Sequence, residues 1–354
     1  MYLSRHIVCI SLYSSDYSRS SVYLNSNSAR RANIEFIKIR SSFLHIIGDL
    51  ISLAKNSLEK NTVVVVLSPS HVLVIVLRVI WRGSIILDAG WPLVDAAKTR
   101  ERGVFRILKA IIIDFLSFHM ASKVILESVT QMNRIRKLMV LKKDKLSVIF
   151  TGVNESAFGR VSIKMPELSL LDEKKPTVLF RGSFNPESGL DTILRMSRLP
   201  GAERFNLLIL TNNPQASTSE SPNLVIVTRR LKVEEISHAY KVATLCLGQL
   251  SENSRLEFTI PHKAFEAGFF GKPYLTGDYS AVRELYNSHN QVVYIRAFDE
   301  NSLLLGITQV LSNPQLLMRL GTEINKRYKS VANQDKLGSQ FLSEVLIKPA
   351  YTIS

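Results

Sequence analysis

Short apolar runs rich in β-branched residues alternate with stretches of helical periodicity along this chain, and the alternation occurs in two series. The first series includes His6–Leu12, Ile34–Ile39 and Thr62–Leu67, and the second starts at Thr177–Phe180. Strands that are apolar at every position and are followed by helices are typical of a parallel sheet covered on both faces. We therefore predict an α/β protein with two Rossmann-like, doubly wound domains that face a cleft.

The stretch between the two series indicates a domain connection. Gly159–Pro176 has mixed polarity and contains the charged run Asp172–Lys175. A chain of 354 residues also suits two ordinary domains better than one. We place the domains at residues 1–165 and 176–335 and interpret residues 336–354 as a polar tail.

The positive charge is concentrated in the N-terminal half. The formal net charge is +15, of which +12 falls in residues 1–170 and +3 in the rest. Such a field attracts polyanions or an anionic membrane leaflet, although charge that only promotes solubility is the alternative. Nucleic acid is not an expected partner, because the basic residues are not interleaved with aromatic ones and no recognition motif is present.

Cysteine usage and hydropathy predict a cytoplasmic protein. Cys9 and Cys246 lie far apart in apolar runs, which favours two buried thiols over a disulfide or a zinc site. The most apolar long segment, Val63–Ile80, contains Pro69 and Arg78, so we predict a strand, a turn and a helix there and not a membrane span. No signal peptide is recognisable.

A second apolar stretch, Ile107–Phe118, is preceded by a basic one. Its basic residues are Arg100, Arg102, Arg106 and Lys109. A basic amphipathic helix can lie on an anionic leaflet, so peripheral contact with the inner face of the cell membrane is one expectation. A buried helix with a solvated start is the other.

The segment Thr259–Asp278 contains the strongest candidate for a binding site. Pro261 suits the first turn of a helix, where the amides of His262, Lys263 and Ala264 would face outward beside the positive end of the helix dipole. A lysine is unfavourable in a first turn unless an anionic ligand binds there. Glu266 follows one turn later on the same face. The alternative is a helix–turn–strand connection whose charges face solvent.

The same segment resembles a known signature. Pro261-x-Lys263-x-Phe265-Glu266-Ala267, followed by Gly271-Lys272-Pro273 and Asp278, is similar to the donor-site motif of retaining GT-B glycosyltransferases, the group 1 (family 4-like) enzymes of bacterial polysaccharide and glycolipid biosynthesis. Further similar pieces occur in the family's order: Ala121–Ser128, Val148–Phe158, Phe180–Asp191 and Asn313–Gly321. The resemblance covers residues 120–330 well and residues 1–120 only in outline.

The resemblance implies transfer of a sugar from a nucleotide-sugar donor to a glycan or lipid-linked acceptor, with retention of configuration and with no resident cofactor or metal. Arg181 and Lys263 would stabilise the diphosphate, and Glu266 would accept hydrogen bonds from the ribose. Further donor-binding candidates are Gly182, Ser183, Ser188, Glu257, Ile260, Pro261, His262 and Ala264. Asp88, His119 and the loop Ser14–Ser20 are candidates on the acceptor side.

Two positions depart from the family pattern. The family commonly has two glutamates separated by seven residues, but Phe258 occupies the first of these positions and Glu257 lies one residue away. Ser188 stands where a lysine usually precedes glycine. A catalytically degenerate binding subunit and a nucleotide-sugar epimerase on the same fold therefore stay open as alternatives.

Overall fold

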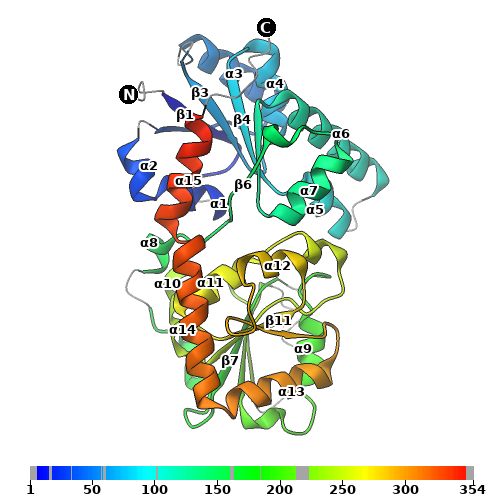
Figure 1. Cartoon of the computed structure of the whole chain (residues 1–354), viewed down its shortest axis with the longest axis vertical. Coiled ribbons are helices and arrows are strands. Elements are labelled where there is room, and N and C mark those ends of the chain that lie inside the picture. Colours follow the sequence, from blue (N-terminus) through cyan, green and yellow to red (C-terminus); the bar gives the residue numbers. More distant parts are fainter. Residues whose placement is uncertain are drawn as a thin grey trace. The chain divides into compact units, whose positions relative to one another are not determined.

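The computed structural model describes residues 6–15, 18–32, 34–56, 58, 61–100, 103–159, 163–183, 185–212 and 223–347, and the statements below refer to these. The chain forms two compact units (Figure 1). The first contains residues 1–154 together with 334–354, and the second contains residues 155–333.

The first unit contains a parallel sheet in the order β2-β1-β3-β4-β5-β6. Its strands are β1 (Ile7–Ser11), β2 (Ile34–Lys38), β3 (Val63–Leu67), β4 (Ser84–Gly90), β5 (Lys123–Leu126) and β6 (Leu146–Val148). The strands β1 and β3 are buried at every position, as expected for a sheet with both faces covered. Strand order reverses at β1, which pairs with both β2 and β3.

Helices cover both faces of this sheet. They are α1 (Ser18–Leu24), α2 (Asn27–Arg31), α3 (Phe43–Asn56), α4 (Val72–Ile80), α5 (Leu93–Thr99), α6 (Val104–Met120), α7 (Val129–Leu138) and α15 (Gln334–Leu346), with a 3-10 turn at Lys143–Lys145. On one face Leu50, Leu77, Phe118 and Ile135 from α3, α4, α6 and α7 join one core. The predicted strand, turn and helix within Val63–Ile80 are confirmed as β3 and α4.

The opposite face corrects the predicted polar tail. Residues 334–346 form α15, which packs beside α1 and α2 of the first unit (Figure 1). Leu337, Phe341 and Val345 recur at helical spacing and are fully buried, and Phe341 stacks on Tyr23 with ring centroids 4.8 Å apart. Residues 334–354 thus belong to the first unit, because the end of the chain completes its core. The predicted boundary at 165 lies instead at 154, because residues 155–158 contact the second unit, where the Ser237 hydroxyl donates to the Phe158 carbonyl.

The second unit contains a parallel sheet in the order β12-β11-β10-β7-β8-β9. Its strands are β7 (Thr177–Arg181), β8 (Asn206–Leu210), β9 (Leu224–Val227), β10 (Leu245–Leu247), β11 (Tyr274–Gly277) and β12 (Val293–Ile295). The order reverses between β7 and β10, which are hydrogen-bonded neighbours. The predicted α/β class with two Rossmann-like sheets is confirmed.

The helices of the second unit are α8 (Glu155–Phe158), α9 (Leu190–Met196), α10 (Val233–Val242), α11 (His262–Phe270), α12 (Ser280–Leu285), α13 (Glu300–Leu311) and α14 (Pro314–Val331). Short 3-10 turns lie at Pro166–Leu170, Ala202–Arg204 and Ser254–Glu257. Within the described ranges of both units, none of the helices combines the length and the apolar character needed to span a bilayer.

Candidate functional site

Three loops meet at the carboxyl edge of the second sheet, at the point where strand order reverses. Ser251 after β10 donates its hydroxyl hydrogen to the carbonyl of Pro186 after β7, over 2.5 Å. The amide of Gly277 at the end of β11 donates to the carbonyl of Gln249 over 2.9 Å. Ligands of doubly wound sheets bind beyond this edge at the reversal point, so the candidate site starts here.

The loop after β7 needs glycine at position 189. Gly189 has a φ of +67°, and a Cβ there would lie 2.5 Å from the backbone carbonyl carbon of Leu250. Next to it, the Ser188 hydroxyl donates to the Asn185 carbonyl and accepts from the Leu190 amide. Ser188 is buried and shapes this turn, whereas Ser183 is exposed on the same loop.

The helix α11 begins at His262, so Pro261 is the extended N-cap residue and not, as predicted, a residue of the first turn; the C-cap Gly271 adopts a φ of +62°. Ile260 and Pro261 are buried and His262 is half-buried. One of the three amides expected to face outward differs, because the Ala264 amide donates to the Pro261 carbonyl over 2.9 Å. A tight first turn therefore uses this amide inside the helix.

Lys263 extends from α11 to the end of β7, where it is only 6% exposed. Its Nζ lies 3.8 Å from the centroid of the Phe180 ring and donates to Oε1 of Gln249 over 3.0 Å. Burial, and then the nearby charge of Arg181, hold the pKa of this ammonium well below its ordinary value. An added Cβ on Gly182 would lie 2.8 Å from Nζ, so the glycine leaves the ammonium room at the strand end.

Arg181, the last residue of β7, is bonded to Glu266 of α11. Nη1 of Arg181 donates to Oε1 of Glu266 over 2.5 Å, and the Tyr240 hydroxyl donates to Oε2 over 2.6 Å. The Glu266 residue is 5% exposed, whereas the Arg181 side chain is 32% exposed. The buried Glu266 carboxylate therefore binds one side of the Arg181 guanidinium, and the other side of the guanidinium is partly exposed to solvent.

Glu257 is hydrogen-bonded to the start of α12 and not to Arg181 or Lys263. Its Oε2 accepts from both the amide and the hydroxyl of Ser280, over 3.1 and 2.6 Å. These contacts give Glu257 the position of a cap on the first turn of α12. The structure thus brings Arg181, Gly182, Lys263 and Glu266 together, and it uses Ser188 and Glu257 to shape the surrounding loops.

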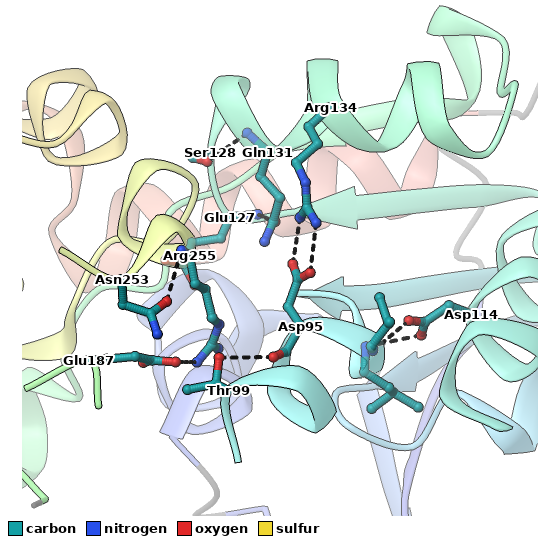
Figure 2. A network of polar contacts seen from close by, with 12 residues as sticks. Asp95, Thr99, Asp114, Glu127, Ser128, Gln131, Arg134, Glu187, Asn253 and Arg255 are labelled. Carbon is teal, nitrogen blue, oxygen red and sulfur yellow. Dashed lines mark hydrogen bonds and ion pairs between the residues drawn. The ribbon is translucent and has the colours of Figure 1, made fainter. Parts of the chain in front are cut away.

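Two residues of the site were not found from the sequence. Gln249 lies two residues after the end of the buried strand β10, so the rule that ligands bind beyond the carboxyl ends could have indicated it. Tyr240 lies on α10 with no motif around it, and only the fold brings it to Glu266. The neighbouring loop Ser251–Arg255 is anchored by Arg255, whose Nη1 donates to Oε1 of Glu187 over 2.5 Å (Figure 2).

The acceptor-side candidates in the first unit have different outcomes. Asp88 is buried in β4 and accepts from Nε of Arg19 over 2.9 Å, so its charge is already paired. His119 lies at the end of α6, which leads into the start of β5, so this residue belongs to the amino edge of the sheet and not to the carboxyl edge. Part of the loop Ser14–Ser20, at residues 16 and 17, lies outside the described residues.

Solved structures similar to this chain extend over nearly its whole length. Sucrose-phosphate synthase from Thermosynechococcus elongatus superposes with a TM-score of 0.74 at 13% identity, covering 96% of this chain and 98% of that chain. Anabaena HepE in complex with UDP-glucose gives 0.70 at 11%, with 96% and 98% covered. WaaG, a glycosyltransferase involved in lipopolysaccharide biosynthesis, gives 0.65 at 14%, with 96% and 99% covered.

This chain has the GT-B fold. No protein-family model and no curated protein sequence matches it. At these identities the GT-B structures share the architecture with this chain, and the chemistry has to be argued from its own residues.

Proposed function

We propose that this protein is a GT-B glycosyltransferase that moves a sugar from a nucleotide-sugar donor to a glycan or lipid-linked acceptor with retention of configuration. The observation that carries the proposal is the convergence of Arg181 and Lys263 at the carboxyl edge, where the strand order of the second sheet reverses. The complexes of HepE with UDP and with UDP-glucose support a donor of this class.

The two cations match the charge that develops when a glycosidic bond to a diphosphate breaks. Arg181 offers a partly exposed guanidinium, and Lys263 offers a buried ammonium beside the start of α11. Fixed positive groups in a site of low dielectric stabilise a leaving group more strongly than water does. In this proposal they do the work for which other enzymes use a divalent cation, so no resident metal or cofactor is invoked.

Glu266 has two roles in the proposal. Through Oε1 it holds Arg181, and through Oε2 it is held by Tyr240. Each carboxylate oxygen has more than one lone pair, so Glu266 also accepts hydrogen bonds from the donor ribose, as the motif resemblance implies. Among the remaining motif residues, the half-buried His262 lines the donor site at the start of α11, while the buried residues Ile260, Pro261 and Ala264 support this turn from behind.

The acceptor is assigned to the first unit, which carries most of the positive charge. We place the protein in the cytoplasm, peripheral at the inner face of the cell membrane, in cell-surface polysaccharide or glycolipid biosynthesis. The assignment to cell-surface polysaccharide or glycolipid biosynthesis is supported by the fold that this chain shares with WaaG, a glycosyltransferase involved in lipopolysaccharide biosynthesis.

A panel of nucleotide-sugars, starting with UDP-glucose, tests the donor site by thermal shift. A donor at one hundred times its Kd should stabilise the folded protein by about 2.7 kcal/mol. The Lys263→Met variant is the matched control, since it keeps the apolar stem over Phe180 and should lose most of the shift. If no member of the panel stabilises the wild-type protein, the proposal is wrong.

Product analysis separates the two alternatives from transfer. A transferase releases the nucleoside diphosphate when an acceptor is present, whereas an epimerase changes the sugar of the intact donor without any acceptor. A degenerate subunit would bind the donor but would neither transfer nor epimerise its sugar.

A further inference from the structure

The outward side of α6 is an apolar surface. We define the α6 outer face as Val104, Phe105, Leu108, Ile111, Ile112 and Phe115, whose exposures run from 38% to 89%. At 3.6 residues per turn these six side chains fall within an arc of roughly 120°. Contiguous exposed apolar surface of this kind marks an interaction site.

The inward side of the same helix is apolar as well. Phe118 joins the main core of the first unit, and Ala110 packs with Val94 and Ala97 of α5. A helix that is apolar on both sides is normally buried all round. Here α6 is buried on one side, and the described part of the chain leaves the other side open to solvent. The α6 outer face therefore needs an apolar partner.

The charges around this face are positive. Arg106 and Lys109 of α6 are exposed, as are Lys98 and Arg100 from α5, which packs against α6. The single acidic residue of α6, Asp114, is buried and accepts from the amides of Leu93 and Val94 (Figure 2). At 3.6 residues per turn Lys109 borders the apolar face on one side, and an apolar face bordered by a cation, within a basic unit, fits a leaflet of acidic phospholipids.

We propose that the α6 outer face inserts into an anionic membrane leaflet and that Lys109, at the edge of this face, binds lipid phosphates, while the exposed cation Arg106 in the first turn adds to the attraction. The direction of α6 suits this role. The helix leads into the amino end of β5, so its first turn, with the most exposed residue Phe105, lies toward the carboxyl edge where doubly wound sheets bind ligands. Insertion of this turn brings the acceptor-side edge of the first unit to the lipid headgroups.

Vesicle sedimentation tests the surface with the full chain. Vesicles of phosphatidylglycerol and phosphatidylethanolamine should bind the wild-type protein at least tenfold more tightly at low salt than vesicles of phosphatidylcholine. The variant F105Q/L108Q/I112Q/F115Q should lose at least tenfold of this affinity. Exposed apolar residues of the second unit provide the matched control L170Q/L305Q/M318Q, which should bind within twofold of the wild type.

Two further variants separate insertion from charge attraction. In Phe105→Trp, added anionic vesicles should shift the emission to shorter wavelength, because the indole moves into an apolar environment. In R106Q/K109Q, binding to anionic vesicles should fall and the remaining binding should depend less steeply on salt. Circular dichroism and the thermal midpoint check folding, and the single substitution Phe105→Gln replaces the fourfold variant if the latter does not fold.

Absence of wild-type binding to anionic vesicles, or equal binding by the fourfold variant, would overturn the proposal. Light scattering provides the other decisive result. A wild-type dimer that the fourfold variant dissociates, without any vesicle binding, assigns the α6 outer face to a second copy of this chain. Donor binding, measured by thermal shift without lipid, is independent of this surface, so absence of vesicle binding would remove the peripheral membrane location from the proposed function and leave its donor site intact.

Discussion

The ammonium of Lys263 lies 3.8 Å from the centroid of the Phe180 ring, so an aromatic face and the amide oxygen of Gln249 are its immediate neighbours. Burial is the main reason, and the charge of Arg181 the second, that the pKa of Lys263 is well below its ordinary value. A diphosphate placed beside Nζ reverses this balance, because an anion favours the charged form of the amine. Donor binding should therefore be linked to protonation of Lys263.

The linkage predicts that the affinity for the donor falls as the pH rises. Below the pKa of Lys263 in the free protein the amine is charged in both states, and the affinity for the donor is at its maximum. Above it, binding takes up a proton, and the affinity falls by up to about tenfold per pH unit until the pKa of the bound state is passed. Calorimetry in buffers of different ionisation enthalpy measures this uptake directly. A nucleotide-sugar serves as the ligand because its diphosphate does not titrate near neutral pH.

The Lys263→Met variant is the control for this linkage. It should bind the donor more weakly at low pH, and its affinity should not change with pH through the same range. A wild-type protein that binds the donor without taking up a proton at any pH would show that Lys263 does not contact the diphosphate.

Glu266 gives a second prediction, which separates its two proposed roles. In Glu266→Gln the negative charge that faces Arg181 is lost, while the geometry of the side chain is kept. If Glu266 positions Arg181, the affinities for UDP and for inorganic pyrophosphate should fall together, by about tenfold for one lost charged hydrogen bond. If it acts only on the ribose, UDP binding should fall and pyrophosphate binding should not change. We expect both to fall, with the larger loss for UDP.

The Tyr240→Phe variant is the companion to this experiment. It removes the hydroxyl that bonds to Oε2 of Glu266 and leaves the ring stacked on Phe270, with centroids 5.0 Å apart. We expect a loss of about fivefold in affinity for both ligands, because only part of the roughly 1.5–3 kcal/mol of a hydrogen bond to a charged group reaches the ligand through Arg181. An unchanged affinity would mean that Glu266 holds Arg181 without this support.

The glycines of the β7 loop give a third prediction, based on two kinds of close approach. In Gly182→Ala the added methyl group meets the far end of the flexible Lys263 side chain, so the protein should fold normally and bind the donor more weakly. In Gly189→Ala the methyl group meets the backbone of Leu250, and φ is +67°. This variant should lose about 2 kcal/mol or more of unfolding free energy. Urea unfolding and donor titration of both variants check the contrast, which a reversed pattern would contradict.

The fold was readable from the sequence because buried parallel strands leave an uninterrupted apolar signal. The strand β3 is Val63–Leu67, with no polar residue, and β8 is Asn206–Leu210, with one. The helix α15 lacked such a signal, since polar residues lie between Leu337, Phe341 and Val345. These three side chains also pack against a unit whose other residues lie before position 155. Sequence periodicity indicates a helix of this kind but not the unit to which it belongs.

The candidate site was readable where a motif lies within one element. Pro261, Lys263 and Glu266 are neighbours on α11, so their spacing alone placed them together. Tyr240 and Gln249 join them because β10 lies beside β7 in the sheet, a pairing that the local sequence does not specify. The same limit affected Asp88, whose partner Arg19 precedes it by 69 residues.

The pair formed by Arg19 and Asp88 gives the last prediction. Both side chains are almost fully buried, and Nε of Arg19 donates to both carboxylate oxygens over 2.9 and 3.2 Å. Asp88→Ala leaves a buried guanidinium without its main counter-ion and should cost about 3–5 kcal/mol of unfolding free energy. The double variant R19M/D88L replaces both charges by apolar groups and should recover most of that loss. Urea unfolding of the two single variants and the double variant measures the coupling, which we expect to be about 3 kcal/mol. Losses that simply add would show that Arg19 is held mainly by other contacts, such as the 3.2 Å hydrogen bond from Nη1 to the hydroxyl of Thr151 and the Tyr23 ring, whose centroid is 5.3 Å from Cζ.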